Sequence, residues 1–164
     1  MLTRLLYLPI RPTLFALFVL CFGELGFGLY LQHGLGLKPC PMCIMQRYAL
    51  ITIGLIALIG GWHERRGKIY STVILLAALA GGGIAAWQSW LQFNPPGMAQ
   101  CGPGLEYMLE NFPLTQLLPM LFRGAGDCSD PAWVFLGLSI ANWSFVNFVM
   151  LTVLALWLIL RRAK

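Results

Sequence analysis

The sequence predicts an all-α protein, an integral membrane four-helix bundle. Three observations predict this fold: an extreme composition, four apolar stretches of membrane-spanning length, and a one-sided distribution of basic residues. The chain has 164 residues, of which 59% are hydrophobic and only 10% are charged. A typical soluble domain has about 45–50% apolar and about 25% charged residues. This composition excludes a disordered protein, an ordinary soluble enzyme and a nucleic-acid-binding domain, and it indicates a lipid bilayer as the main solvent.

Four apolar stretches each have the length of a membrane-spanning helix. A helix crosses a hydrocarbon core of about 30 Å with about 20 residues. In lipid every backbone N–H and C=O must be paired within the protein, so each stretch is expected to be helical. Together with two outward loops, at residues 32–43 and 91–142, the stretches make one membrane domain over residues 1–164. The predicted spans are residues 13–31, 44–62, 69–90 and 143–160.

The basic residues predict the orientation of the bundle, because positively charged loop residues stay in the cytoplasm. Eight lie on one side of the predicted membrane: Arg4, Arg11, Arg65, Arg66, Lys68, Arg161, Arg162 and Lys164. The other side has three: Lys38, Arg47 and Arg123. Both termini are therefore expected in the cytoplasm and both long connections outside. The first span lacks a small-residue cleavage pattern, so it is expected to be retained rather than removed as a signal peptide.

Four of the five cysteines fall in the two outward loops, and the fifth, Cys21, lies in the middle of the first span. A lone cysteine in lipid behaves as a small hydrophobe, so Cys21 is assigned no role. An outward compartment is oxidising, which favours disulfide chemistry for the other four. Cys40 and Cys43 form one pair. Cys101 and Cys128 form the other, 27 positions apart in a loop rich in proline and glycine that suits movement between partners.

The segment Cys40-Pro41-Met42-Cys43 has the C-x-x-C spacing of a redox dithiol and lies where the second span begins. Pro41 suits the first position of a helix, which makes Cys40 about the N-cap and Cys43 about the third helical residue. Backbone N–H groups and the positive end of the helix dipole then stabilise a thiolate at Cys43. The sequence therefore predicts a reactive thiol at the membrane boundary.

Two charged residues lie inside the predicted membrane. Arg47 is one helical turn after Cys43 and shares a face with it. A guanidinium costs about 2.5–3.5 kcal/mol at mid-bilayer and less near the surface, and a polar partner lowers the cost. A membrane-dissolved carbonyl compound is one such partner; the alternative is that Arg47 only marks the span boundary. Glu24 lies about 10 Å below the outer end of the first span, where an inward hydrogen bond is favoured over a role in proton transfer.

These residues resemble the DsbB family of bacterial disulfide bond formation proteins, the quinone-reducing thiol oxidases of the inner membrane. A C-x-x-C motif alone is a weak signal, but its position at a span start, with a second outward pair in a four-span protein, is specific. The resemblance extends over most of the chain. It is carried by Glu24-Leu25, Lys38-Pro39-Cys40-Pro41-Met42-Cys43 with Arg47, Phe112-Pro113-Leu114, Gly126-Asp127-Cys128, and Phe135-Leu136-Gly137-Leu138 with Trp143.

The resemblance implies a role for each candidate site residue. Cys101 and Cys128 would form the disulfide that meets a periplasmic DsbA-type thiol oxidase, with Cys101 forming the mixed disulfide. Cys40 and Cys43 would form the membrane-proximal pair. Cys43 would lie beside a membrane quinone, either ubiquinone or menaquinone, and Arg47 would contact a quinone oxygen. Electrons would pass from the partner through both cysteine pairs to the quinone pool of the bilayer.

The resemblance also implies a setting and one departure. The protein would act in electron transport in the bacterial inner membrane and supply disulfide bonds, a chaperone-like contribution to folding. Family members often have a histidine near the outer end of the third span, close to the quinone. The corresponding residue here is Gln88, which donates hydrogen bonds but cannot carry a positive charge.

Three other interpretations fit part of the pattern. Two structural disulfides in a non-enzymatic membrane assembly protein would also explain four outward cysteines. A zinc site is less consistent, because only one C-x-x-C is present and the second pair is widely spaced. A conduit that carries electrons outward needs cysteines within the bundle, where the sequence has only Cys21.

Overall fold

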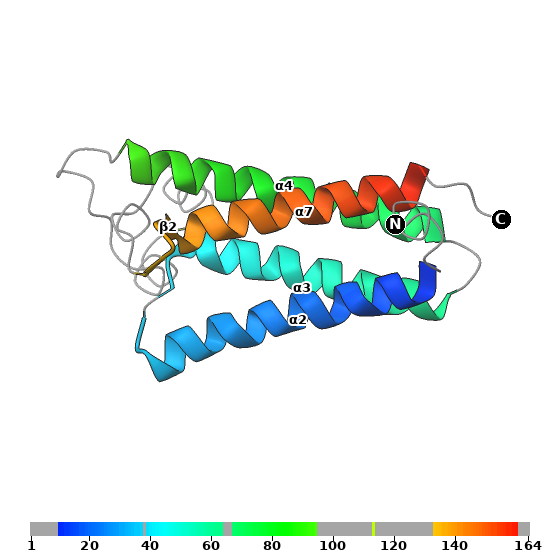
Figure 1. Cartoon of the computed structure of the whole chain (residues 1–164), viewed down its shortest axis with the longest axis horizontal. Coiled ribbons are helices and arrows are strands. Elements are labelled where there is room, and N and C mark those ends of the chain that lie inside the picture. The colour runs from blue at the N-terminus through cyan, green and yellow to red at the C-terminus, as the bar shows by residue number, and fades with distance from the viewer. Residues whose placement is uncertain (1–9, 38, 64–66, 95–112, 114–132, 161–164) are drawn as a thin grey trace.

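The computed structural model describes residues 10–37, 39–63, 67–94, 113 and 133–160. Within these ranges four long helices run side by side along the long axis of the molecule (Figure 1). Each is long and apolar enough to cross a membrane. The fold is therefore the predicted membrane four-helix bundle, and the chain is a multi-pass membrane protein. The helices are α2 (Ile10–Gly34), α3 (Pro41–Trp62), α4 (Gly67–Phe93) and α7 (Ile140–Leu160).

All four helices extend beyond the spans predicted for them. α2 gains three residues at each end, and α3 begins three residues early, at Pro41. α4 likewise begins before and ends after its predicted span, and α7 begins at Ile140 rather than at residue 143. The reason is that hydropathy marks only the part of a helix inside the hydrocarbon. Hydrogen-bonded turns continue into the polar interface, where water and polar side chains satisfy the helix ends.

A short antiparallel hairpin precedes α7, and the sequence did not predict it. Its two joining residues both have positive φ, 53° at Leu136 and 79° at Gly137. This turn geometry matches the right-handed twist of paired strands and is easier for glycine than for leucine. The indole N–H of Trp143 donates a hydrogen bond to the carbonyl of Phe135 over 3.0 Å and ties the hairpin to α7. The strands are β1 (Val134–Phe135) and β2 (Leu138–Ser139).

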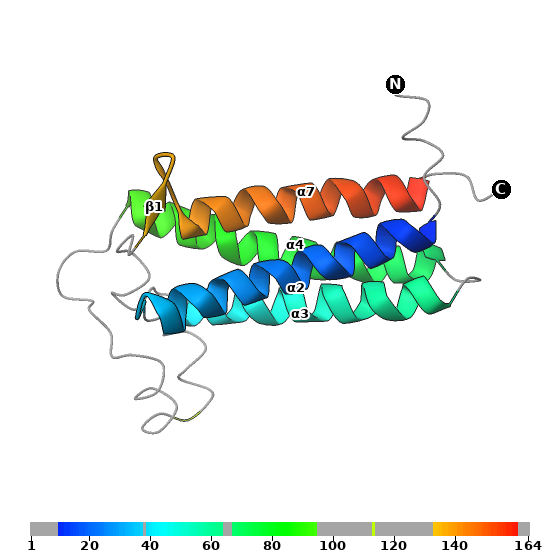
Figure 2. The same ribbon diagram turned by 60° about the horizontal axis from the view of Figure 1, so that its bottom comes forward.

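The helices pack in chain order, α2 on α3, α3 on α4 and α4 on α7, whereas α2 and α7 approach each other only at isolated points. Figure 2 shows the two halves of this arrangement, with α2 lying along α3 and α7 lying along α4. The core between the helices is built from aliphatic and small side chains. Its completely buried members include Leu14, Ile53, Ala57, Ile74 and Ala78.

Cys21 is part of this core and is completely buried, as a small hydrophobic side chain would be. The two ends of the bundle differ in what they carry. Cys40 and the hairpin lie at one end, called here the cysteine end (Figure 1). Ile10 and Leu160 lie at the other, the opposite end.

Candidate active site

The C-x-x-C segment forms the first turn of α3 as predicted. Cys40 is the N-cap, with an extended backbone (φ −73°, ψ 159°), and Pro41 opens the helix. The Sγ of Cys40 accepts a hydrogen bond from the backbone N–H of Cys43 over 3.2 Å. The two sulfur atoms lie 2.8 Å apart. The cap therefore holds the two sulfurs next to each other, as interconversion between dithiol and disulfide requires.

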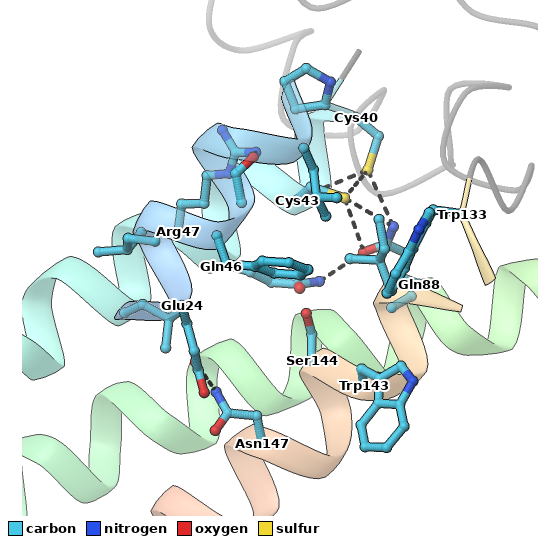
Figure 3. A pocket seen from close by; sticks show the side chains of 18 of the residues that line it. Glu24, Cys40, Cys43, Gln46, Arg47, Gln88, Trp133, Trp143, Ser144 and Asn147 are labelled. Carbon is cyan, nitrogen blue, oxygen red and sulfur yellow. Dashed lines mark hydrogen bonds between the residues drawn. The ribbon is translucent and has the colours of Figure 1, made fainter. Parts of the chain in front are cut away.

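A buried pair of glutamines faces these sulfurs (Figure 3). The side-chain nitrogen Nε2 of Gln88 donates to Sγ of Cys40 over 3.2 Å and to Sγ of Cys43 over 3.3 Å. Its oxygen Oε1 accepts a hydrogen bond from Nε2 of Gln46 over 2.8 Å. Both glutamines are less than 5% exposed. Gln46 was not identified from the sequence, although a glutamine inside a predicted span is itself a signal of an inward polar contact.

Arg47 contacts α2. Its Nη1 donates to Oε1 of Gln32 over 2.6 Å, and its Nη2 donates to the carbonyl of Gly28 over 3.1 Å. The protein itself therefore supplies polar partners for this guanidinium, and Gln32 was not identified from the sequence. A guanidinium carries five N–H donors, so these two bonds leave it the capacity to bind a further oxygen.

Glu24 lies one helical turn before Gly28, deeper in the bundle. Its Oε2 accepts a hydrogen bond from Nδ2 of Asn147 over 2.6 Å, and this contact bridges α2 and α7 (Figure 3). The inward hydrogen bond expected for Glu24 is thus confirmed. Asn147 was not identified from the sequence, because nothing in the order of residues places position 147 opposite position 24.

A cavity of about 630 Å³ lies among these groups, with walls from all four helices and the hairpin. Most of its lining is apolar or aromatic, and a few polar groups reach it. Mainly apolar cavities with a few placed polar groups are typical of small-molecule sites. The cavity therefore brings together Cys40, Cys43 and Arg47, as the sequence analysis expected. The lining polar residues also include Glu24, Gln46, Gln88, Ser144 and Asn147.

Aromatic side chains of the hairpin region line the same cavity. Trp133 stacks on Phe135 with ring centroids 5.7 Å apart, and its edge meets Phe27 of α2 at 6.2 Å. Trp143 also lines the cavity, next to Phe135. The motif Phe135-Leu136-Gly137-Leu138 thus has a structural explanation, since its tight turn positions aromatic rings at the cysteine end of the cavity.

Cys101 and Cys128 lie outside the described residues. Their pairing, and their approach to Cys40 and Cys43, stay predictions from the sequence. Of the two cysteine pairs of the expected relay, the structure therefore describes the membrane-proximal one, Cys40 and Cys43.

Known proteins are similar to this chain over nearly its whole length. The family model "Disulfide bond formation protein DsbB" matches residues 10–158. The chain belongs to the DsbB family. Disulfide bond formation protein B of Azoarcus sp. (strain BH72) is 59% identical over 155 residues, which are 93% of each chain. That of Aromatoleum aromaticum is 58% identical over 155 residues, again 93% of each, and that of Acidovorax sp. (strain JS42) is 49% identical over 146 residues, 88% of this chain and 84% of the relative.

Membership of the DsbB family makes this chain a disulfide-forming oxidoreductase of the membrane. The site geometry agrees with that chemistry, because the two sulfurs of the C-x-x-C segment lie next to each other at a mainly apolar cavity large enough for a small molecule.

Proposed function

We propose that the protein reoxidises a periplasmic DsbA-type thiol oxidase and passes the electrons to a membrane quinone. The observation that carries the proposal is the common cavity of the Cys40–Cys43 dithiol and the guanidinium of Arg47. Reduction of a hydrophobic quinone ring calls for three features: an apolar cavity, a thiol able to donate electrons, and a cationic hydrogen-bond donor.

The residues present suit a quinone head group. Aromatic and aliphatic side chains line most of the cavity, and Arg47 offers donors to a carbonyl oxygen. Phe27 and Met150 line the cavity and are also more than half exposed on the lipid-facing surface, so a membrane-dissolved molecule can reach it. A quinone bound there supplies an acceptor for two electrons and two protons and leaves as the quinol.

The chain's own residues then have distinct roles. The partner's thiolate attacks the Cys101–Cys128 disulfide, and internal exchange passes the two electrons to Cys40 and Cys43. Cys43 holds the thiolate from which the electrons leave, supported by its position in the first turn of α3. The partner's dithiol loses two electrons and two protons and becomes a disulfide, while the relay cysteines return to their starting state.

The proposal includes a location, the bacterial inner membrane, with both termini in the cytoplasm and the cysteine end toward the periplasm. Arg11 and Lys68 support this orientation, because both are exposed at the opposite end of the bundle, where α2 and α4 begin. Cytoplasmic ends of spans carry the excess of lysine and arginine.

The test is anaerobic stopped-flow measurement of quinone absorbance, with reduced DsbA-type oxidase as the electron donor. The wild-type protein is expected to bleach the quinone chromophore, and Cys43→Ser is expected to lose all turnover, because a hydroxyl cannot take part in thiol exchange. Cys21→Ala is the matched control, since Cys21 is buried away from the cavity, and it is expected to retain turnover. Absence of bleaching with the wild type, or full turnover in Cys43→Ser, contradicts the proposal.

A further inference from the structure

Gln88 contacts both sulfurs of the dithiol at once. Its amide nitrogen carries two N–H groups, and the two sulfurs lie at nearly equal distances from it, 3.2 Å for Cys40 and 3.3 Å for Cys43. Gln88 is on α4, 45 positions after Cys43, and is 3% exposed. The contact therefore joins two helices and is largely buried.

Gln46 sets the orientation of the Gln88 amide. The Nε2 of Gln46 donates to Oε1 of Gln88 over 2.8 Å, so the carbonyl end of the Gln88 amide points toward Gln46 and the N–H end toward the sulfurs. In this orientation the amide of Gln88 makes all three contacts, and its N–H groups, unlike its carbonyl oxygen, can donate to a thiolate.

The other polar groups of the cavity do not replace this contact. The hydrogen bonds of Arg47 go to Gln32 and Gly28 on α2. Gln92, one turn after Gln88 on the same helix, bonds Ser139 instead. The side-chain hydrogen bonds that reach both sulfurs from α4 come from Gln88.

We propose that Gln88 is a catalytic residue of the thiol relay, whose side-chain N–H groups stabilise the thiolate formed when the Cys40–Cys43 disulfide opens, and that Gln46 is the residue that positions it. The proposal rests on the relay function proposed above and adds a residue to it. An incoming thiolate forms a bond to the sulfur of Cys40, the Cys40–Cys43 bond breaks, and the electron pair stays on Cys43. Gln88 already contacts that sulfur, and hydrogen bonds to a charged acceptor are about twice as strong as neutral ones.

The contact has a consequence for the redox equilibrium of the dithiol. A donor that stabilises the thiolate stabilises the reduced state over the disulfide. Removal of the donor should therefore shift the equilibrium with a glutathione buffer toward the disulfide. The expected shift for Gln88→Met, which keeps the side-chain length and removes the N–H groups, is about tenfold, the effect of one lost hydrogen bond to a charged group.

The experiment uses the full-length protein in detergent, without quinone or partner, at mildly alkaline pH in glutathione buffers. The oxidised fraction of Cys40 and Cys43 is read by alkylation and site-resolved mass spectrometry. Gln46→Met is expected to shift the equilibrium in the same direction by about threefold, because Gln88 remains but is no longer oriented. Thr72→Val is the control and is expected to leave this equilibrium unchanged, because Thr72 lies near the other end of α4, outside the cavity, and its hydroxyl bonds the carbonyl of Lys68.

An unchanged equilibrium in folded Gln88→Met overturns the proposal, as does a shift toward the dithiol. If Gln88→Met does not fold, Gln46→Met decides: a shift toward the disulfide supports the proposal and no shift overturns it. Because the buffer contains no quinone, this assay tests the role of Gln88 independently of the proposed relay function. A wild-type protein that does not reduce quinone contradicts the relay, whereas intact quinone reduction with an unchanged equilibrium contradicts only the role of Gln88.

Discussion

The two ends of the bundle are built from different kinds of contact. At the opposite end the helices meet through aliphatic and small residues, with Gly60 and Gly61 packed against the rings of Tyr70 and Phe15. At the cysteine end the helices enclose a cavity, and polar side chains connect them. The cross-helix hydrogen bonds there include Gln88 to Cys43, Gln46 to Gln88, Arg47 to Gln32 and Gly28, and Asn147 to Glu24.

This difference shows how a membrane bundle can keep a hollow site. Lipid tails are as apolar as leucine side chains, so helices in a bilayer associate through close packing and hydrogen bonds rather than by escape from lipid. A cavity removes close packing at one end. Polar contacts between helices then hold that end together, and the same polar groups equip it for chemistry.

Of three variants that test this comparison, Arg47→Met at the cysteine end is expected to have the largest effect. The variant loses the two bonds to α2 and the donors available to a quinone oxygen. Its apparent affinity for quinone is expected to fall by about a hundredfold, since hydrogen bonds from a charged group contribute about 1.5–3 kcal/mol. The KM for quinone in steady-state turnover measures this. Arg11→Met, at the opposite end, is the matched control and is expected to leave the KM for quinone unchanged. An equal KM for the two variants would contradict a contact between Arg47 and the quinone.

The next largest effect concerns close packing, at Gly81 in the middle of the bundle. A Cβ at Gly81 would overlap the ring of Phe148, a completely buried side chain. Gly81→Ala is therefore expected to lower the free energy of unfolding by about 2 kcal/mol through overpacking. Gly83→Ala is the control, because nothing lies within 4 Å of its added Cβ. Denaturation in mixed micelles measures both, and equal stability of the two variants would contradict a tight α4–α7 contact.

The smallest of the three effects concerns the Glu24–Asn147 bridge. Asn147→Leu removes the hydrogen-bond partner that Glu24 has across the bundle and is expected to lower the free energy of unfolding by about 1 kcal/mol. Replacing both residues by leucine is expected to restore part of this loss, because no partly buried acceptor is then left without its donor. The same denaturation assay applies. Strict additivity of Glu24→Leu and Asn147→Leu in the double variant would show that the bridge is not energetically coupled.

The sequence predicts some features of this protein because their causes act along consecutive residues. Hydropathy over about 20 residues marks each span, because the bilayer acts on every residue of a helix in turn. The cap at Cys40, the first-turn position of Cys43 and their adjacent sulfurs follow from the local order Cys-Pro-Met-Cys. Arg47 beside Cys43 follows from the helical repeat.

Only the tertiary structure decides which distant residues complete the site. Gln88 meets a sulfur 45 positions away, and Asn147 meets Glu24 across 123 positions. Such contacts depend on how each helix is rotated about its axis and how closely it packs on its neighbours, which all side chains determine together. The hairpin before α7 was also not predicted, because its strands are only two residues long and show no alternation of apolar and polar residues. The order of residues thus specifies the spans and the dithiol, and the packing of the bundle supplies the polar groups around them.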